Sequence, residues 1–389
     1  MKLPAGQNSF SFGFYQAKYQ KISLLIIWVF LQCFFLWKNG IVTSLEAVKY
    51  IDQASVFLAT GKYSSGNFLF YSVQILLIAL CLKLKISYLF LVIFQMLANG
   101  ISIVCFYKLV MKFSQNNLFT FVATLYFLLF AYYHLFNTYL FTESLFFSFS
   151  VIYTYVLFTR KKFNAKIILV IVLFLSLLYF TRPTGIFFIP ATFVFIAIKF
   201  YSKKALRIIA VSFVAAIAGS YFLFNYSIGS GGELDFLLPY LDERIICGVP
   251  TISEPHKFTV PVNKNSIEGL LYIISHNFQL FFRLGMQRLG AFFGIYRPFY
   301  STIHNIIGSS YFYLMYIVII AGVRNLFKQH KAEVWFLLCN IGLMAATVML
   351  SCDEWSNRFI LAVMPFILLL GVISLTNYKK KFHAAGNNG

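Results

Sequence analysis

Acidic side chains beside apolar segments are the residues of this sequence that could do chemistry. Glu46 and Asp52 lie in a polar stretch, residues 44–66, that follows the first long apolar run, and Glu143 begins a later apolar run. An ionisable group at a membrane boundary indicates a functional site. Two carboxylates that converge on one pocket can bind a cation or act as a general base. We therefore predict that these three acids are catalytic.

Basic side chains at similar boundaries could bind an anion. Arg182 lies in a Thr-Arg-Pro-Thr-Gly turn, and Arg358 directly precedes the last apolar run. A guanidinium group can hold a phosphate through two parallel hydrogen bonds. Each arginine also has a structural explanation, because Pro183 suits a helix start and an interfacial arginine can reach the headgroups. The predicted substrate-binding residues are Tyr50, Arg182, Arg297, Asp353 and Arg358.

The composition is that of a membrane protein. Of the 389 residues, 60% are hydrophobic and 11% are charged, whereas soluble proteins average roughly half apolar and about a quarter charged residues. The formal net charge is +20, but the lysines and arginines occur in short clusters between apolar runs. This pattern is typical of cytoplasmic loop ends and argues against a nucleic-acid partner.

Apolar runs of about twenty residues, the length that crosses a bilayer, predict an all-α polytopic membrane protein. With the basic clusters and both termini in the cytoplasm, about ten transmembrane helices are expected. One run must then fail to cross, and we expect 68–84 to be interfacial or re-entrant. The candidate runs are 22–37, 68–84, 86–107, 118–136, 139–159, 166–181, 185–199, 207–226, 309–323, 333–350 and 359–376.

This topology predicts a single transmembrane domain, residues 1–389, with two large outer loops that carry interfacial helices. The first outer loop is 38–85, and the long outer loop is 227–308. Every acid except Glu333 falls on the outer face in this scheme. Outer loops also need charge simply to stay soluble, so the acids of the long loop have a plain explanation.

The segment 44–60 has the pattern of an amphipathic helix next to the membrane. On a helical projection, Glu46, Tyr50 and Gln53 fall on one face, and Val48 falls on the other. An ordinary interfacial helix with its polar side in water would show the same pattern. Helical spacing alone therefore leaves both interpretations open.

The six cysteines predict neither a metal site nor a disulfide framework, because none of them shows the spacing of such sites. Four lie in apolar runs, where a thiol packs as a small hydrophobic side chain. Cys247 and Cys352 fall in predicted outer loops, so a disulfide between these two stays open.

The motifs resemble those of bacterial integral-membrane glycosyltransferases of the GT-C type, which include protein mannosyltransferases, oligosaccharyltransferases and lipid A aminoarabinose transferases. The similarity extends over nearly the whole chain, and each motif is short. The matching segments are the acid-x-x-x-Tyr helix from Glu46 to Tyr50 with Ala54 and Gly61, the Thr-Glu-Ser-Leu-Phe start from Thr142 to Phe146, the Arg-Pro-Thr-Gly turn from Arg182 to Gly185, and Asn-Arg-Phe from Asn357 to Phe359 before Pro365.

The resemblance implies an inverting glycosyltransferase in the inner (plasma) membrane, which moves a sugar from a polyprenyl-phosphate donor to a glycan, lipid or protein acceptor. Such enzymes place an acid from the first outer loop at the acceptor hydroxyl. Glu46 occupies this position, where the family usually has Asp, and Asp52 is its rival. Glu143 matches the second-loop acid, which helps to hold a divalent metal such as Mg or Mn in some members, and Arg182 and Arg358 would neutralise the lipid phosphate.

Two other functions stay open for the sequence. A transporter or flippase of lipid-linked glycans is expected to carry ionisable groups or broken helices near the bilayer midplane. The acids of this chain instead gather at one predicted surface. A polysaccharide polymerase also works on lipid-linked sugars outside the membrane, and only the placement of the acids separates it from the first function.

Overall fold

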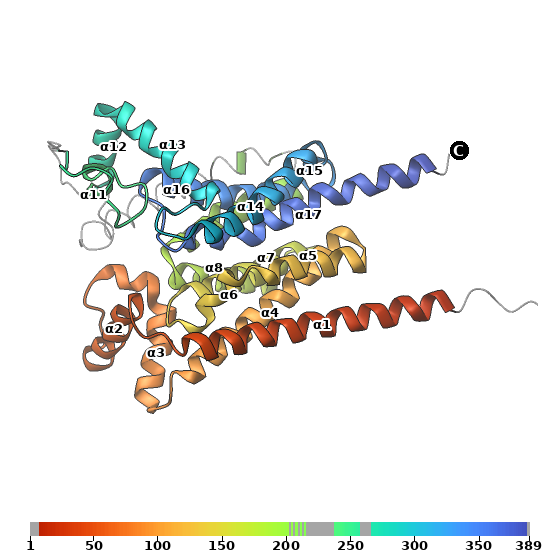
Figure 1. Ribbon diagram of the computed structural model, residues 1–389, viewed down its shortest axis with the longest axis horizontal. Helices are drawn as coiled ribbons and strands as arrows, with labels where there is room; N and C mark the ends of the chain where they lie inside the picture. The colour runs from red at the N-terminus through yellow and green to blue at the C-terminus, as the bar shows by residue number, and fades with distance from the viewer. Residues whose placement is uncertain are drawn as a thin grey trace, which may run out of the picture. The chain divides into compact units, whose positions relative to one another are not determined.

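The computed structural model describes residues 8–201, 204, 207, 208, 211, 214, 237–256 and 266–386, with side chains from 17 to 375. This part of the chain is mostly helical, and β-pairing occurs there only as isolated bridges (Figure 1). The α-helices and the 3₁₀ helices (η) are α1 (Asn8–Asn39), α2 (Glu46–Thr60), η1 (Gly66–Tyr71), α3 (Ser72–Leu84), α4 (Leu89–Ser114), α5 (Asn117–Leu129), α6 (Ala131–Leu135), η2 (Phe136–Thr138), α7 (Glu143–Thr159), α8 (Ala165–Thr181), η3 (Pro183–Phe187), α9 (Phe188–Phe200), α11 (Leu238–Leu241), α12 (Ile267–His276), α13 (Phe278–Gly294), α14 (Thr302–Ala321), α15 (Val323–Gln329), α16 (Lys331–Leu350) and α17 (Arg358–Gly386).

The helices confirm the prediction of an all-α protein embedded in a membrane. In the described residues, 7 segments are long and apolar enough to cross, or up to 8 if α5 and α6–η2, which meet at 62°, form one span. The predicted count of about ten is not confirmed, and the predicted span 207–226 lies almost entirely outside the described residues. The seven segments are Ala17–Asn39, Gly66–Leu84, Leu89–Ser114, Pro183–Phe200, Thr302–Ala321, Lys331–Leu350 and Arg358–Leu375.

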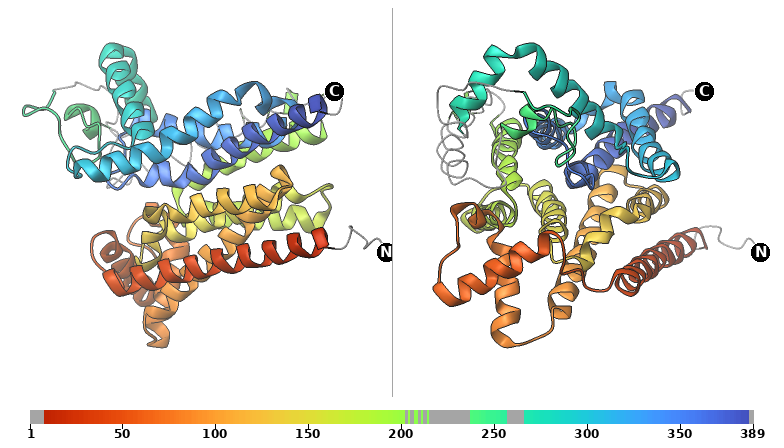
Figure 2. Two further views of the ribbon diagram at one scale, coloured as in Figure 1. Left: turned by 45° about the vertical axis from the view of Figure 1, so that its right-hand side comes forward. Right: turned by 60° about the vertical axis from the view of Figure 1, so that its left-hand side comes forward.

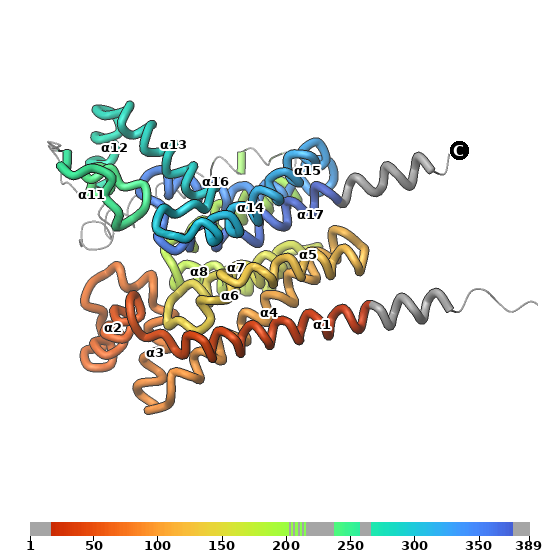
Figure 3. Tube along the Cα trace, in the orientation of Figure 1, coloured from red at the N-terminus to blue at the C-terminus, as the bar shows by residue number. Residues whose placement is uncertain are grey.

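The chain divides into two compact units. Unit 1 comprises Met1–Leu58 and Val73–Phe174, and unit 2 comprises Ala59–Ser72 and Leu175–Gly389. In unit 1, α4 packs against α5 and α7, and α1 packs against α5. In unit 2, α17 packs against α14, α15 and α16, and α16 also packs against α9. The tube in Figure 3 lets the chain be followed through both units.

Lys112 and the predicted catalytic acids lie at opposite ends of the helices of unit 1. Lys112, near the end of α4, donates a hydrogen bond to the carbonyl of Phe158 at the end of α7. Glu143 begins α7 at its other end, and α2, which begins at Glu46, follows the end of α1 that is farther from the N-terminus (Figures 1 and 2). The acids predicted to be catalytic therefore share one end of this unit.

In unit 2, acidic and basic residues lie at both ends of α16. At the start of α16, Glu333 forms an ion pair with Lys199 at the end of α9, with 2.9 Å between Oε1 and Nζ. At its other end, α16 leads into the loop that carries Asp353 and Arg358. The side chains of α17 from Ile360 to Ile373 are almost all buried, so the helix that begins at Arg358 is fixed by its packing.

Candidate active-site residues

The predicted helix after the first span is present as α2. It begins at Glu46, and Tyr50 and Gln53 lie on its buried face together with Ala47 and Ala54. Val48 is exposed. The separation of Tyr50 and Gln53 from Val48 around the helix is therefore as the projection gave it, and the structure adds that Tyr50 and Gln53 are buried.

Glu46 is part-exposed at the edge of this buried face. Its side chain is 29% exposed, and its Oε1 lies 3.8 Å from Nζ of Lys49. The Lys49 ammonium lies 5.0 Å from the centroid of the Tyr50 ring. Asp52 is exposed on α2 outside the buried face. Of the two rival acids, Glu46 is thus the one that adjoins the protein interior.

Glu143 is the second predicted acid, and it is fully buried. It is the first residue of α7, where the positive end of the helix dipole favours a carboxylate. The hydroxyl of Thr142 donates a hydrogen bond of 3.5 Å to its Oε2. A buried carboxylate is costly unless its environment compensates its charge, so this position suits a residue that binds or orients a substrate.

A short backbone pairing in unit 1 brings together the two segments that carry these acids. The N–H of Val42 donates to the carbonyl of Thr138 at 2.9 Å, and the N–H of Leu140 donates to the carbonyl of Val42 at 3.1 Å. Glu46 follows Val42 closely in the sequence, and Glu143 follows Leu140 closely. The two acid-bearing helices therefore begin from the same small structural unit.

Buried amides hold the segment before Glu143 in place. The Asn137 amide donates to Oε1 of Gln32 at 2.8 Å, and its Oδ1 accepts from the hydroxyl of Ser144 at 2.6 Å. The Gln95 amide donates to the carbonyl of Tyr139 at 2.8 Å. The sequence analysis missed this network, although glutamines inside apolar runs were a signal for it. Buried polar side chains of this kind need partners inside the protein.

Arg182 lies at the turn after α8, as predicted. Only 9% of it is exposed, and its guanidinium carbon lies 5.7 Å from the centroid of the Phe359 ring. Phe359 is the neighbour of Arg358 at the start of α17. The two arginines predicted to bind phosphate are therefore brought to the same part of unit 2.

Gly185 shapes this turn, and we expect Gly185→Ala to disrupt it. A Cβ on Gly185 would lie 2.2 Å from the carbonyl oxygen of Leu178. The N–H of Gly185 also donates to the carbonyl of Arg182 at 2.8 Å. Overpacking at such a position typically costs about 1–3 kcal/mol. Thermal unfolding in detergent should show a lowered Tm for this variant. Gly290→Ala is the control, because a Cβ there meets nothing within 4 Å, and an equal loss in both variants would contradict the expectation.

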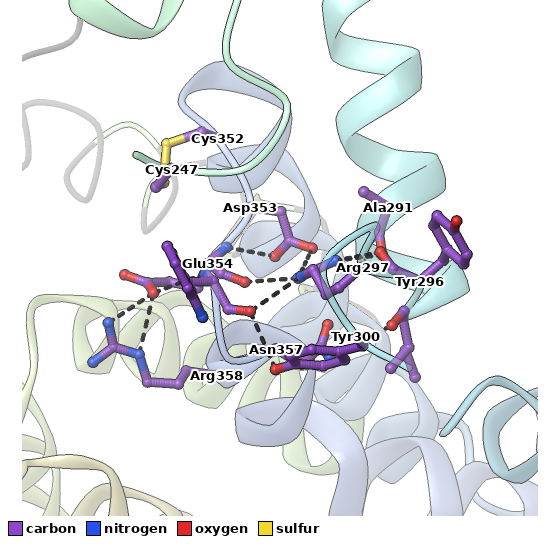
Figure 4. Close-up of polar contacts among 12 residues, drawn as sticks. Cys247, Ala291, Tyr296, Arg297, Tyr300, Cys352, Asp353, Glu354, Asn357 and Arg358 are labelled. Carbon is purple, nitrogen blue, oxygen red and sulfur yellow. Dashed lines mark hydrogen bonds and ion pairs between the residues drawn. A yellow bond between two sulfur atoms is a disulfide. The ribbon is translucent and has the colours of Figure 1, made fainter. Parts of the chain in front are cut away.

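Arg358 is held by an acid from the preceding loop (Figure 4). Its Nε and Nη2 donate to Oε2 of Glu354 at 3.2 and 2.7 Å. Arg358 is 7% exposed. A guanidinium with two donors turned to one side has the geometry that suits a carboxylate or a phosphate.

Arg297 and Asp353 form a fully buried ion pair beside this loop. Nη2 of Arg297 lies 2.5 Å from Oδ2 of Asp353, and both side chains are 0% exposed. Arg297 also donates to the backbone carbonyls of Glu354 and Trp355. Burial raises the pKa of Asp353 to about 6, although the charge of Arg297 opposes the rise. These contacts favour a role in positioning the loop over the predicted direct contact with substrate.

A disulfide fixes the same loop from the other side. Cys247 and Cys352 are joined, with their Cα atoms 5.2 Å apart. The N–H of Cys247 donates to the carbonyl of Asp353, and the N–H of Asp353 donates to that of Ile245, both at 2.8 Å. The pairing that the sequence left open is therefore present. Disulfides persist in oxidising compartments, so the bridge agrees with an extracytoplasmic position for this loop.

The disulfide gives a direct chemical prediction. Protein extracted from the membrane, denatured without reductant and alkylated should carry label on Cys33, Cys81, Cys105 and Cys339, which are free in the structure. Reduction before alkylation should add label at Cys247 and Cys352. Peptide mass spectrometry identifies the labelled positions, and full labelling of this pair without reductant would contradict the assignment.

The described residues do not supply a dedicated metal site. Among them, no group of three or more His, Cys, Asp or Glu side chains is arranged to hold a metal ion. Magnesium sites often use only one or two carboxylates together with waters and substrate phosphates. The predicted Mg or Mn stays a prediction.

Comparisons with protein-family models, with curated proteins and with solved structures found no match to this chain. The resemblance to GT-C glycosyltransferases therefore rests on the motifs alone. Their residues cluster in two groups, one in unit 1 with Glu46 and Glu143, and one in unit 2 with Arg182 and Arg358.

Proposed function

We propose that the protein is a membrane glycosyltransferase that moves a hexosyl or pentosyl group from a polyprenyl-phosphate donor to a glycan, lipid or protein acceptor. The observation that carries the proposal is the backbone pairing of Val42 with Thr138 and Leu140. This pairing joins the helix start that bears Glu46 to the one that bears Glu143. Two carboxylates at the start of adjoining segments are the arrangement that the motifs imply.

The reaction is a single displacement at the anomeric carbon. The acceptor hydroxyl oxygen attacks this carbon while the bond from the carbon to the phosphate oxygen breaks, and polyprenyl phosphate leaves with the electron pair. Glu46 takes the hydroxyl proton as general base. One displacement inverts the anomeric configuration. Glu46 suits this role because it is part-exposed, whereas the buried Glu143 suits the orientation of substrate.

The arginines serve the leaving group in this proposal. Arg182 and Arg358 neutralise the charge that develops on the lipid phosphate, which is electrostatic stabilisation of the transition state. Glu354 now accepts the donors of Arg358, and a bound phosphate would take over these hydrogen bonds. Arg297 and Asp353 keep the loop in shape rather than touching the substrate.

We further propose that about ten helices cross the bacterial inner membrane with both termini cytoplasmic. Of the 7 candidate spans, Gly66–Leu84 is interfacial, and the bent pair, α7, α8 and the run 207–226 complete the set. Support comes from α3, which runs across the direction of α1 rather than along it (Figures 1 and 2). The basic ends of the helices, which include Lys112 and Lys199, fit the cytoplasmic side.

A donor panel tests this function. Purified protein in lipid vesicles is incubated with radiolabelled polyprenyl-phosphate sugars and with candidate acceptors, and the products are separated by solubility. We expect the label from one donor to appear on an acceptor. Movement of an intact donor across the bilayer without cleavage would instead support a flippase and overturn the proposal.

A further inference from the structure

A cavity in unit 1 is lined by none of the residues proposed to take part in sugar transfer. Its volume is about 650 Å³, and it opens between α1 and α4. Both of these helices pack against α5, which contributes Thr124 to the lining. The walls are otherwise mostly apolar and include Leu24, Leu25, Leu97 and Ile101. We call this cavity the α1–α4 groove.

One end of the α1–α4 groove is basic. Lys21 of α1 and Lys108 of α4 line it together with Tyr107, and no acid is among the lining residues. Nζ of Lys21 lies 5.8 Å from the centroid of the Tyr107 ring, so the basic residues of the two helices lie at the same level. Neither lysine forms an ion pair within the described part of the chain. This end therefore offers two positive charges without a carboxylate partner, although Nζ of Lys108 also lies 5.6 Å from the centroid of the Tyr155 ring.

Tyr107 adds a polar atom to the basic end. Its hydroxyl is buried and has no hydrogen-bond partner among the described residues. A buried hydroxyl without a partner costs free energy, and an anionic oxygen bound between the lysines could accept its hydrogen bond. The three side chains together suit a phosphate group.

The apolar part of the groove has the length of one membrane leaflet. From Leu97 to Lys108, α4 rises roughly 16 Å at 1.5 Å per residue. The hydrocarbon core of a bilayer is about 30 Å thick, so the groove covers about half of it. The α1–α4 groove thus combines groups that can bind a phosphate at one end with apolar walls as long as one leaflet. These features fit a single lipid molecule better than a water-soluble ligand.

Trp28 fixes the wall of the groove. A Cβ on Gly100 would lie 2.9 Å from Cζ2 of Trp28, so only glycine allows the indole to pack this closely against α4. The indole N–H donates to Oδ1 of Asn99 at 3.0 Å. Trp28 is therefore a rigid residue whose ring lines the groove, and it can report on what fills the groove.

We propose that the α1–α4 groove binds one anionic phospholipid, with its phosphate at Lys21, Lys108 and Tyr107 and an acyl chain along the apolar walls. Charge complementarity selects an anionic headgroup over a zwitterionic one. The site lies at the end of unit 1 away from Glu46 and Glu143, and it does not depend on the proposed sugar transfer.

Quenching of Trp28 by brominated lipids tests the proposal. The chain has 4 tryptophans, and the variant with Trp37→Phe, Trp335→Phe and Trp355→Phe leaves Trp28 as the single reporter. It is reconstituted in phosphatidylcholine vesicles that contain a varied fraction of dibrominated phosphatidylglycerol or dibrominated phosphatidylcholine. We expect half-maximal quenching at a mole fraction about 30-fold lower for phosphatidylglycerol, which is the ratio expected for two lysines near an anionic lipid.

Charge variants identify the residues that cause the preference. Lys21→Gln with Lys108→Gln should abolish it, and each single variant should reduce it by about 5-fold. Lys83→Gln with Lys85→Gln is the matched control, because it removes the same charge from exposed positions in unit 1 outside the groove, and it should keep the preference. The single variants serve if the double variant does not fold.

Three results would overturn the proposal. Equal quenching by both lipids would show that the groove does not select charge. An unchanged preference in the groove variants would place the selective site elsewhere. Stronger competition from polyprenyl phosphate than from unlabelled phosphatidylglycerol would assign the groove to a donor lipid instead of a membrane phospholipid.

Discussion

Glu46→Gln is expected to lower the rate of sugar transfer by about 10²–10⁴-fold, the usual contribution of a general base. Glutamine has the shape of glutamate but cannot accept the proton of the acceptor hydroxyl. Glu46 is part-exposed, and its distance of 3.8 Å from Lys49 is long for an ion pair. Exposed pairs contribute little to stability, so the substitution should cost little stability. The measurement is kcat at saturating donor and acceptor, in protein whose insertion and elution profile match the wild type.

Asp52→Asn is the matched control for this prediction. Asp52 lies on the same helix, α2, but outside its buried face, and it should keep nearly full activity. If the base is Asp52 instead, the outcome reverses, and Glu46→Gln retains transfer while Asp52→Asn loses it. The pair of variants therefore decides between the two acids without any assumption about the sugar.

The second large effect concerns stability. Arg297→Met should destabilise the protein by about 3–5 kcal/mol, because it leaves the carboxylate of Asp353 buried and without its charge partner. Asp353 is 0% exposed, so water cannot replace the lost guanidinium. Denaturant unfolding in detergent at neutral pH, followed by near-UV circular dichroism, measures the change.

Two further variants separate the buried pair from general effects. Arg244→Met removes an arginine that pairs with Asp242, and these side chains are 21% and 11% exposed. Because water can reach the remaining carboxylate in part, the loss should be smaller than for the fully buried pair. Adding Asp353→Leu to Arg297→Met should recover part of the stability, since no charge is then buried. Equal losses in Arg297→Met and Arg244→Met would contradict the assignment of the buried pair.

Local sequence signals predicted the elements that carry the acids. The helix within 44–60, the separation of Tyr50 from Val48 around it, and the start of a helix at Glu143 follow from periodicity and from acids near helix starts. The start of α17 at Arg358 was predicted in the same way. These features depend on residues within one or two turns of helix, which the sequence shows directly.

Contacts between distant residues could not be predicted in this way. The pairing of Val42 with Leu140 depends on backbone groups, which have no signature in the side-chain pattern. Arg297 was predicted to bind substrate, but it forms a buried ion pair with Asp353, which is 56 residues away along the chain. Whether a charged side chain is buried depends on the packing of several helices. A single sequence does not show which distant residues pair, so it does not show which charges are buried.

The number of membrane spans could not be predicted from the sequence either. Hydropathy gives the length of each apolar run, but the bend of 62° between α5 and α6 depends on how the helices pack. The same is true of Gly66–Leu84, whose length and composition suit a span but whose helix α3 runs across the direction of α1 (Figure 1). Composition predicts membrane helices well, and orientation needs tertiary structure.

Release of free polyprenyl phosphate is the most direct measurement of the proposed function. Wild-type protein and Glu46→Gln are incubated side by side with each donor in the panel and with acceptor, and the liberated lipid phosphate is measured over time. We predict release by the wild type in step with glycosylation of the acceptor, and almost none by Glu46→Gln. Failure to cleave any donor, or equal release by both proteins, would contradict the assignment of the chain as a glycosyltransferase that uses Glu46.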